Sequence, residues 1–183
     1  MNHGRPLEAL QGLDRAGRVL YIGTFSKVLF PSLRLGYLVA PPELLKGLIA
    51  TQRLIAVHLP LLEQMALADF MAEGYFARHV RRMRQLYRER RNALVDALKR
   101  ELGKRLEVTV PEAGMHLVVW LPSGMSAQAV AHRAAAYGLP ILPISQFSLR
   151  SLQRDGLLLG FASASPQELR AGAQTLTLAL QAH

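Results

Sequence analysis

The sequence predicts an α/β protein, and three features point to that class. Half of the 183 residues are hydrophobic, which is enough for a substantial core. Short apolar runs rich in β-formers alternate with longer segments whose apolar residues recur every three or four positions. From residue 106 onward the segments follow the order strand, strand, helix, strand, strand, helix. That order is typical of helices packed on one side of a sheet.

The first part of the chain predicts two strands and two helices. Residues 18–24 (RVLYIGT) and 33–40 (LRLGYLVA) form short apolar runs, of which the first is expected to be a buried strand. Pro42 suits the first turn of a helix that continues through residue 54. A second helix is expected from about residue 60 to 73, with Gly74 as its stop. Because two strands do not form a stable layer alone, residues 18–56 are interpreted as part of a larger sheet.

One long helix is predicted from residue 75 to 102, ended by Gly103. Its apolar side chains recur at spacings of three and four and define one stripe, with the arginines mostly on the other faces. The stripe comprises Phe76, Val80, Met83, Leu86, Tyr87, Leu94, Leu98 and Leu102.

The remaining strands are predicted at residues 107–110, 114–122, 139–145 and 156–163, with Trp120 expected in the core.

Two helices complete this part. Ser126 is predicted to cap the helix at 126–138, which Gly138 would end. Ser165 and Glu168 have the spacing of a capping box at the start of the last helix.

Composition and charge exclude several classes of function. The chain has no cysteine, which removes disulfides, thiolate metal sites and cysteine nucleophiles, and fits a reducing cytoplasm. No pair of histidines has metal-ligand spacing, so no metal site is expected. We find no signal peptide and no apolar run long enough to span a bilayer, and therefore expect a cytoplasmic protein.

The net charge of +9 is concentrated in one segment. Residues 78–105 contain eleven Lys and Arg against three acids, a balance of +8. Contact with nucleic acid is one interpretation. A solvated helix face is favoured, because Phe76 and Tyr87 fall on the apolar stripe instead of interleaving with the arginines.

A lysine and an arginine stand at the ends of the first two predicted strands. Lys27 at the edge of an apolar strand loses hydration, so its neutral amine becomes available to form a Schiff base with an aldehyde. Thr24 and Ser26 add hydroxyls, and the planar fork of Arg34 suits a phosphate. Pyridoxal 5′-phosphate (PLP) carries both an aldehyde and a phosphate. The residues alone leave open the alternative of a solvated loop lysine and a surface arginine.

The segment GTFSKVLFPSLRLGYLV, residues 23–39, resembles the lysine motif of the fold-type-I PLP enzymes, the aspartate aminotransferase superfamily. The matching positions are Thr24, Phe25, Ser26, Lys27, Arg34, Leu35, Gly36 and Tyr37. The spacing of seven residues between lysine and arginine is similar to that of the aminoadipate aminotransferase branch. It is more similar still to the aminotransferase-like domain of MocR-type regulators, GntR-family proteins related to GabR and PdxR. Residues 58–98, 113–122 and 156–163 also resemble that group, so the likeness extends from about Gly4 onward.

The resemblance implies part of the PLP-dependent transferase fold, namely the end of the large domain plus the small carboxy-terminal α/β domain. Residues 1–57 would be the remnant of the large domain with the lysine motif. Residues 58–183 would be linking helices and the small domain.

The resemblance also implies roles for individual residues. Lys27 would form the internal aldimine with PLP and, in an enzyme, would act as the general base of the 1,3-proton shift. Arg34 and Thr24 would bind the cofactor phosphate, and Ser26 would help to shape that pocket. The implied function is a PLP-binding effector domain of a MocR/GabR-type transcriptional regulator that takes an amine or amino acid as ligand. Such proteins dimerise and read DNA through an amino-terminal winged helix, which is not part of this sequence.

Two departures from the family pattern argue against efficient catalysis. Only 26 residues precede Lys27, so the upstream cofactor contacts, including the acid that pairs with the pyridine nitrogen, are not in this chain. Leu158 stands where aminotransferases carry the arginine that holds the substrate carboxylate, although Arg150 or Arg154 could reach in. Transaminase activity is therefore left open.

Two alternatives follow: a fragment of a free-standing aminotransferase of the aminoadipate branch, and a basic binding module without PLP chemistry. Leu158 counts against the first, and retention of Lys27 and Arg34 counts against the second. A piece of this fold would expose apolar surface, so poor solubility or non-native association is expected when it is expressed alone.

Overall fold

The computed structural model describes residues 8–103 and 106–181. Within it the chain divides into two compact units, Met1–Arg81 (unit 1) and Arg82–His183 (unit 2). This division falls inside one long helix. The domain boundary expected between residues 57 and 58 stays a prediction, and its outermost residues, 1–7 and 182–183, lie outside the described part.

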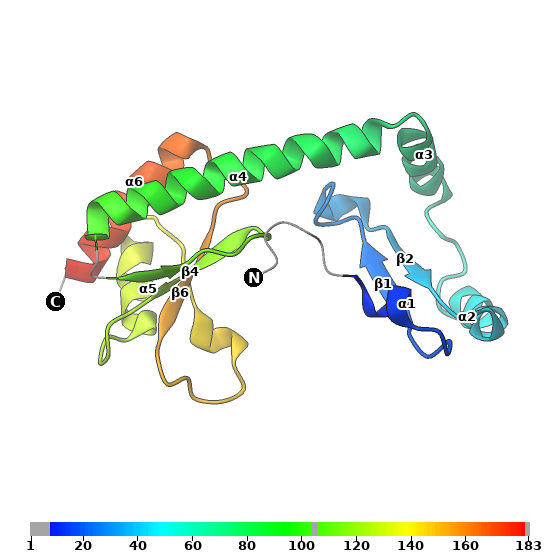
Figure 1. Cartoon of the computed structure of the whole chain (residues 1–183), viewed down its shortest axis with the longest axis horizontal. Helices are drawn as coiled ribbons and strands as arrows, with labels where there is room; N and C mark the ends of the chain where they lie inside the picture. The colour runs from blue at the N-terminus through cyan, green and yellow to red at the C-terminus, as the bar shows by residue number, and fades with distance from the viewer. Residues whose placement is uncertain (1–7, 104–105, 182–183) are drawn as a thin grey trace. The chain divides into compact units, whose positions relative to one another are not determined.

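Unit 1 contains a two-stranded antiparallel sheet and short helical segments (Figure 1). In chain order its elements are α1 (Leu10–Leu13), β1 (Tyr21–Thr24), the 3-10 turn η1 (Pro31–Leu33), β2 (Gly36–Val39), α2 (Pro42–Ile55) and α3 (Leu61–Ala72). Both predicted strands and both predicted helices are therefore present.

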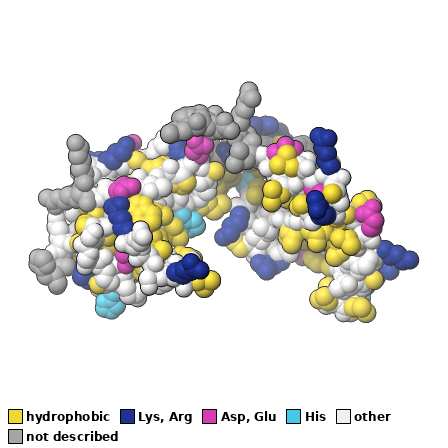
Figure 2. All heavy atoms as spheres, turned by 60° about the horizontal axis from the view of Figure 1, so that its bottom comes forward, with side chains coloured by type: hydrophobic (Ala, Val, Ile, Leu, Met, Phe, Trp, Pro, Cys, Tyr) yellow, Lys and Arg dark blue, Asp and Glu magenta, His cyan; other side chains and the backbone are white. Residues whose placement is uncertain are grey.

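Little of unit 1 is buried. Leu35 and Leu67 are its buried leucines, whereas the side chain of Ile22 in β1 is 79% exposed. The prediction that β1 is a buried strand is wrong for this structure. The side chains of a two-stranded sheet are buried only where another element packs against the sheet. The described residues of unit 1 do not cover Ile22. Figure 2 shows hydrophobic side chains spread over the surface of this unit, on the right of the view.

Helix α4 (Tyr75–Leu102) starts in unit 1 and ends in unit 2. Gly74 and Gly103 flank it with φ of +76° and +57°, a left-handed conformation that favours glycine at helix boundaries. The predicted stripe is confirmed, because Leu94, Leu98 and Leu102 are buried and the earlier members of the stripe are half-buried.

Unit 2 contains a four-stranded antiparallel sheet in the order β3-β4-β6-β5. Its elements are β3 (Glu107–Thr109), β4 (His116–Trp120), α5 (Ala127–Ala136), β5 (Leu142–Pro143), the 3-10 turn η3 (Ile144–Phe147), β6 (Gly156–Gly160) and α6 (Pro166–Gln181). The predicted order of strands and helices is confirmed.

The core of unit 2 lies on one face of this sheet. Leu117 and Val119 of β4 and Leu157 and Leu159 of β6 are buried with side chains from α4, α5 and α6. The alternate residues point to the other face, which no described helix of unit 2 covers with buried side chains. Trp120 belongs to that open face. It is half-buried and its Nε1 donates to Thr109 Oγ1 at 2.8 Å, so its predicted place in the core is wrong.

The predicted caps are confirmed. Ser126 Oγ accepts from the amide of Ala129 at 3.3 Å at the start of α5. At the start of α6, Ser165 and Glu168 exchange side-chain to backbone bonds of 2.6 and 3.3 Å in a capping box. Among the described residues, no helix combines the length and apolarity needed to cross a bilayer.

Candidate functional site

Lys27 lies in a tight turn directly after β1. We define the Lys27 turn as residues Phe25–Leu29, because the amides of Val28 and Leu29 both donate to the carbonyl of Phe25, at 3.1 and 2.8 Å. The side chain of Lys27 is exposed, so the expectation that it loses hydration at the edge of a buried strand is wrong for this structure. The amide of Ser26 donates to Thr24 Oγ1 at 3.2 Å, so this hydroxyl is held beside the turn. The turn thus presents an amine to solvent close to two hydroxyls.

Arg34 is held in an unusual backbone conformation. It ends η1 with φ of 50° and ψ of 26°, the left-handed region, and its amide donates to the carbonyl of Pro31 at 3.4 Å. It is the one described residue other than glycine with a positive φ. Its side chain is exposed. The chain therefore reverses direction at Arg34 and enters β2.

Pairing of β1 with β2 brings the two polar ends of the motif together. Thr24 is in register with Gly36, and the amide of Phe25 donates to the carbonyl of Leu35 at 3.1 Å. The hydroxyl of Thr24 and the backbone of Arg34 therefore belong to adjoining strand ends. The strand register was not predicted from the sequence, and the cofactor roles of these residues stay predictions.

Two glycines permit this close pairing. A Cβ on Gly36 would lie 2.8 Å from the carbonyl oxygen of Gly23, and a Cβ on Gly23 would lie 2.2 Å from Cζ of Tyr37. The Tyr37 ring therefore covers Gly23 and lies with its centroid 5.9 Å from that of the Tyr21 ring. Interaction with the Tyr21 side chain, together with partial desolvation, raises the pKa of Tyr37 above its ordinary value of 10.0.

Arg34 also lines a cavity of about 370 Å³ within unit 1. The wall is apolar at Phe25 and Leu67 and polar at the amides of Gln52 and Gln64, which come from α2 and α3. Lys27, Thr24 and Ser26 are not among the lining residues. The structure thus joins Thr24 and Arg34 through the backbone, whereas Lys27 does not line this cavity. The two glutamines were missed from the sequence, because no spacing relates them to the motif.

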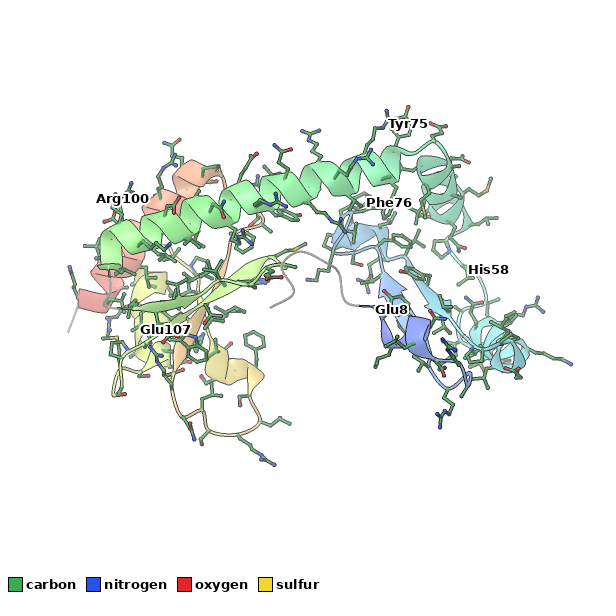
Figure 3. All side chains as sticks on the ribbon, in the orientation of Figure 1. Glu8, His58, Tyr75, Phe76, Arg100 and Glu107 are labelled. Atoms are coloured by element: carbon green, nitrogen blue, oxygen red, sulfur yellow. The ribbon has the colours of Figure 1, made fainter. Side chains whose placement is uncertain are left out.

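Two side chains from the first turns of α4 contact the Lys27 turn. The ring of Phe76, labelled in Figure 3, packs edge-on against Phe25 with centroids 6.0 Å apart and planes at 77°. Nε2 of His79 donates to the carbonyl oxygen of Val28 at 2.9 Å. Sequence reasoning missed His79. The available signal was its position three residues after Phe76, on the same helical face.

Leu158 lies on the open face of the unit 2 sheet. It is in register with Val118 and Leu142 and is half-buried. Its neighbours on the paired strands are therefore apolar.

The guanidinium of Arg154 already has partners. Its Nε donates to the carbonyl of Leu121 at 3.2 Å, its Nη1 pairs with Glu107, and it lies 5.7 Å from the ring centroid of Trp120. Arg150 is exposed, and its amide bonds to Ser148 Oγ. Position 158 of β6 therefore carries an apolar side chain. The guanidinium of Arg154 is engaged by Leu121, Glu107 and Trp120.

The chemistry of the residues at the lysine motif fits PLP. An exposed primary amine can take the aldehyde, and a hydroxyl next to a guanidinium can take the phosphate.

Comparisons with known proteins agree with this chemistry. Residues 2–176 match the family model of aminotransferase class I and II. The probable rhizopine catabolism regulatory protein MocR of Rhizobium meliloti is 41% identical over 98% of this chain and 36% of its own length. The 2-aminoadipate transaminase of Thermus thermophilus is 34% identical over 89% of this chain and 41% of its own length.

Solved structures give the same fold. The kynurenine aminotransferase of Pyrococcus horikoshii superposes with a TM-score of 0.86 at 27% identity, over 97% of this chain and 44% of that one. The chain spans less than half the length of the relatives it matches. This confirms the expected fold, part of the PLP-dependent transferase fold. The chain therefore belongs to the class I and II aminotransferases, a family whose cofactor is pyridoxal 5′-phosphate.

Proposed function

We propose that this chain is the PLP-binding effector domain of a MocR/GabR-type transcriptional regulator, with the cofactor attached at Lys27. The proposal rests on one observation. Pairing of β1 with β2 brings the strand ends that carry Thr24 and Arg34 together, next to the exposed turn that carries Lys27. Two regulators support the choice of branch. MocR of Rhizobium meliloti and the HTH-type regulator YhdI of Bacillus subtilis are 41% and 36% identical to this chain.

Each residue of the motif has a distinct role in this proposal. Lys27 would hold the cofactor through its Nζ, and the same amine, when free, would serve as the base for a bound ligand. Arg34 and Thr24 bind the phosphate, and Ser26 keeps the Thr24 hydroxyl in place through its amide. PLP, when bound, supplies an electron sink for the amine ligand.

Leu158 favours sensing over turnover. An apolar side chain cannot pair with a carboxylate, and Arg154 is engaged by Glu107, Leu121 and Trp120. We infer that an amine or amino acid binds and biases DNA binding by the whole protein. The DNA-reading winged helix would belong to the part of the protein outside this chain, and the intact protein would be a homodimer.

A free-standing aminotransferase of the aminoadipate branch is the second candidate, supported by the 34% identity to the Thermus enzyme. The two differ in what the ligand does. An aminotransferase converts an amino acid and a keto acid in many turnovers, whereas a sensor changes DNA affinity at a single binding event. A basic binding module without PLP chemistry is the least favoured, because Lys27 and Arg34 are both retained.

The test is covalent trapping of the cofactor. The protein that contains this chain is incubated with PLP, reduced with borohydride and digested, and the modified peptide is identified by mass spectrometry. We expect the adduct on Lys27 in the natural protein and in a Lys46→Ala control, whose lysine is exposed on α2. We expect it to be lost in Lys27→Ala. A persistent adduct in Lys27→Ala would overturn the assignment.

A further inference from the structure

The first two turns of α4 contact the Lys27 turn on both sides of the lysine. Phe76 packs against Phe25, two residues before Lys27, and His79 bonds to the carbonyl of Val28, one residue after it. Phe76 and His79 are three residues apart and share one face of α4. One helix therefore contacts the short segment that carries the amine on both sides of Lys27.

The bond from His79 restricts movement of the part of the turn that follows Lys27. Within the turn, the amides of Val28 and Leu29 both bond to a single acceptor, the carbonyl of Phe25. Those bonds close the loop, and the bond from the amide of Phe25 to the carbonyl of Leu35 anchors its first residue, but neither anchors the segment after Lys27. The bond from His79 to Val28 connects residues 51 apart in the sequence. It therefore anchors the residue that follows Lys27 to the first turns of α4.

Neighbouring side chains have other partners. Arg78, next to His79, points to a different part of the helix surface, where its guanidinium lies 4.4 Å from the ring centroid of Tyr75. Tyr75 in turn stacks on Phe70 of α3. Within the described part of this turn of α4, His79 is the side chain that hydrogen-bonds to the Lys27 turn.

We propose that His79 is a positioning residue for Lys27, which together with Phe76 clamps the Lys27 turn so that the amine meets the cofactor aldehyde from a preset direction. This inference rests on the proposed function, because it assumes that Lys27 takes the cofactor. Holding reacting groups in a fixed orientation can change a rate strongly without changing their chemistry. The clamp acts through the backbone of Val28, so its effect is on attachment of PLP and not on the nature of the product.

Three variants separate the hydrogen bond from the bulk of the ring. His79→Phe keeps an aromatic ring without a donor, and His79→Gln places an amide donor near the position of Nε2. His132→Phe is the matched control, because His132 is an exposed histidine on α5 in unit 2. All three are made in the protein that contains this chain.

Two measurements are made on each variant. The first is amide hydrogen exchange of Val28 and Leu29 without cofactor. The second is the rate at which the borohydride-trapped PLP adduct appears on Lys27. In His79→Phe we expect exchange about fivefold faster, the equivalent of one ordinary hydrogen bond. We expect adduct formation to slow about tenfold from lost orientation. His79→Gln should restore both rates toward those of the natural protein, and His132→Phe should change neither.

Each contrary outcome has a distinct meaning. Unchanged exchange in His79→Phe overturns the clamp. Faster exchange with an unchanged rate of adduct formation, or no rescue by Gln, overturns the positioning role and leaves the proposed function intact. Absence of any adduct on Lys27 in the natural protein overturns the proposed function, and the positioning role with it.

Discussion

Gly36 controls how closely the strand ends that carry Thr24 and Arg34 approach each other. A side chain at this position would meet the backbone oxygen of Gly23 at 2.8 Å, and backbone cannot rotate away as a flexible side chain can. The hairpin would have to separate at the point where the amide of Phe25 bonds to Leu35.

Gly36→Ala is therefore expected to lower the free energy of unfolding by about 1–3 kcal/mol, the range for overpacking. It should also weaken PLP binding, because the Thr24 and Arg34 ends are displaced. Chemical denaturation and titration with PLP measure the two effects.

Gly47→Ala is the control for this substitution. Gly47 lies inside α2 with no atom within 4 Å of its added Cβ, so alanine there should stabilise the helix by about 1 kcal/mol. Equal effects of the two substitutions would contradict the steric argument.

At the residue scale the sequence predicted the chemistry better than the contacts. Lys27, Arg34 and Thr24 stand out because their functional groups match a phosphorylated aldehyde. The roles of Gly23 and Gly36 depend on the register of β1 against β2, and that of His79 depends on where α4 meets a turn 51 residues earlier. Neither register nor tertiary contact follows from the spacing of residues along the chain.

At the scale of elements, the carboxylate of Glu168 fixes the start of α6. It accepts from the amide of Ser165 at 2.6 Å, and this bond is the main reason why the pKa of Glu168 lies below its ordinary value of 4.5. The hydroxyl of Ser165 and the charge of Arg90 lower it further. Because the folded pKa is depressed, the stabilising effect is present above pH 4.5 and is lost as the pH falls through the folded value.

Glu168→Gln keeps a side-chain acceptor for the amide of Ser165 but removes the titration. We expect the natural chain to lose more stability than this variant between about pH 5 and pH 3, a window set by the ordinary pKa of Glu. Thermal unfolding at a series of pH values measures the difference. Parallel curves for the two proteins would show that Glu168 does not contribute to acid sensitivity.

Elements with strong periodicity were predicted well, and the weakest element was not. The bounds and apolar stripe of α4 follow from eight apolar residues and flanking glycines. The strand expected at 139–145 is reduced to Leu142–Pro143 and is followed by η3. Pro140 and Pro143 explain the loss, since neither has an amide to donate to a neighbouring strand. The strand was predicted too long because the prediction relied on the apolar composition of residues 139–145.

At the scale of the whole molecule, the two units differ in how completely they bury their apolar side chains. The cluster of buried residues lies in unit 2 and draws on three helices and one face of its sheet. Unit 1 has an α/β composition but leaves Leu54 and Ile55 of α2 exposed by 83% and 81%. The composition predicted that the chain has a core. It did not predict that this core lies in unit 2, almost entirely after residue 93.

This difference predicts that the 183-residue chain, expressed alone, self-associates through unit 1. Sedimentation velocity should show species larger than a monomer. Replacing both Leu54 and Ile55 with lysine should reduce the association, because these positions are exposed and do not contribute to a core. A monodisperse monomer of the unaltered chain would contradict the prediction.

The backbone conformation of Arg34 has a cost that its side chain does not relieve. A left-handed conformation costs a residue with a Cβ about 1 kcal/mol, and glycine would adopt it with little strain. Glycine at 34 would thus favour stability and remove the guanidinium. Under the proposed function, arginine at this position gives up backbone stability in exchange for a guanidinium that binds the cofactor phosphate.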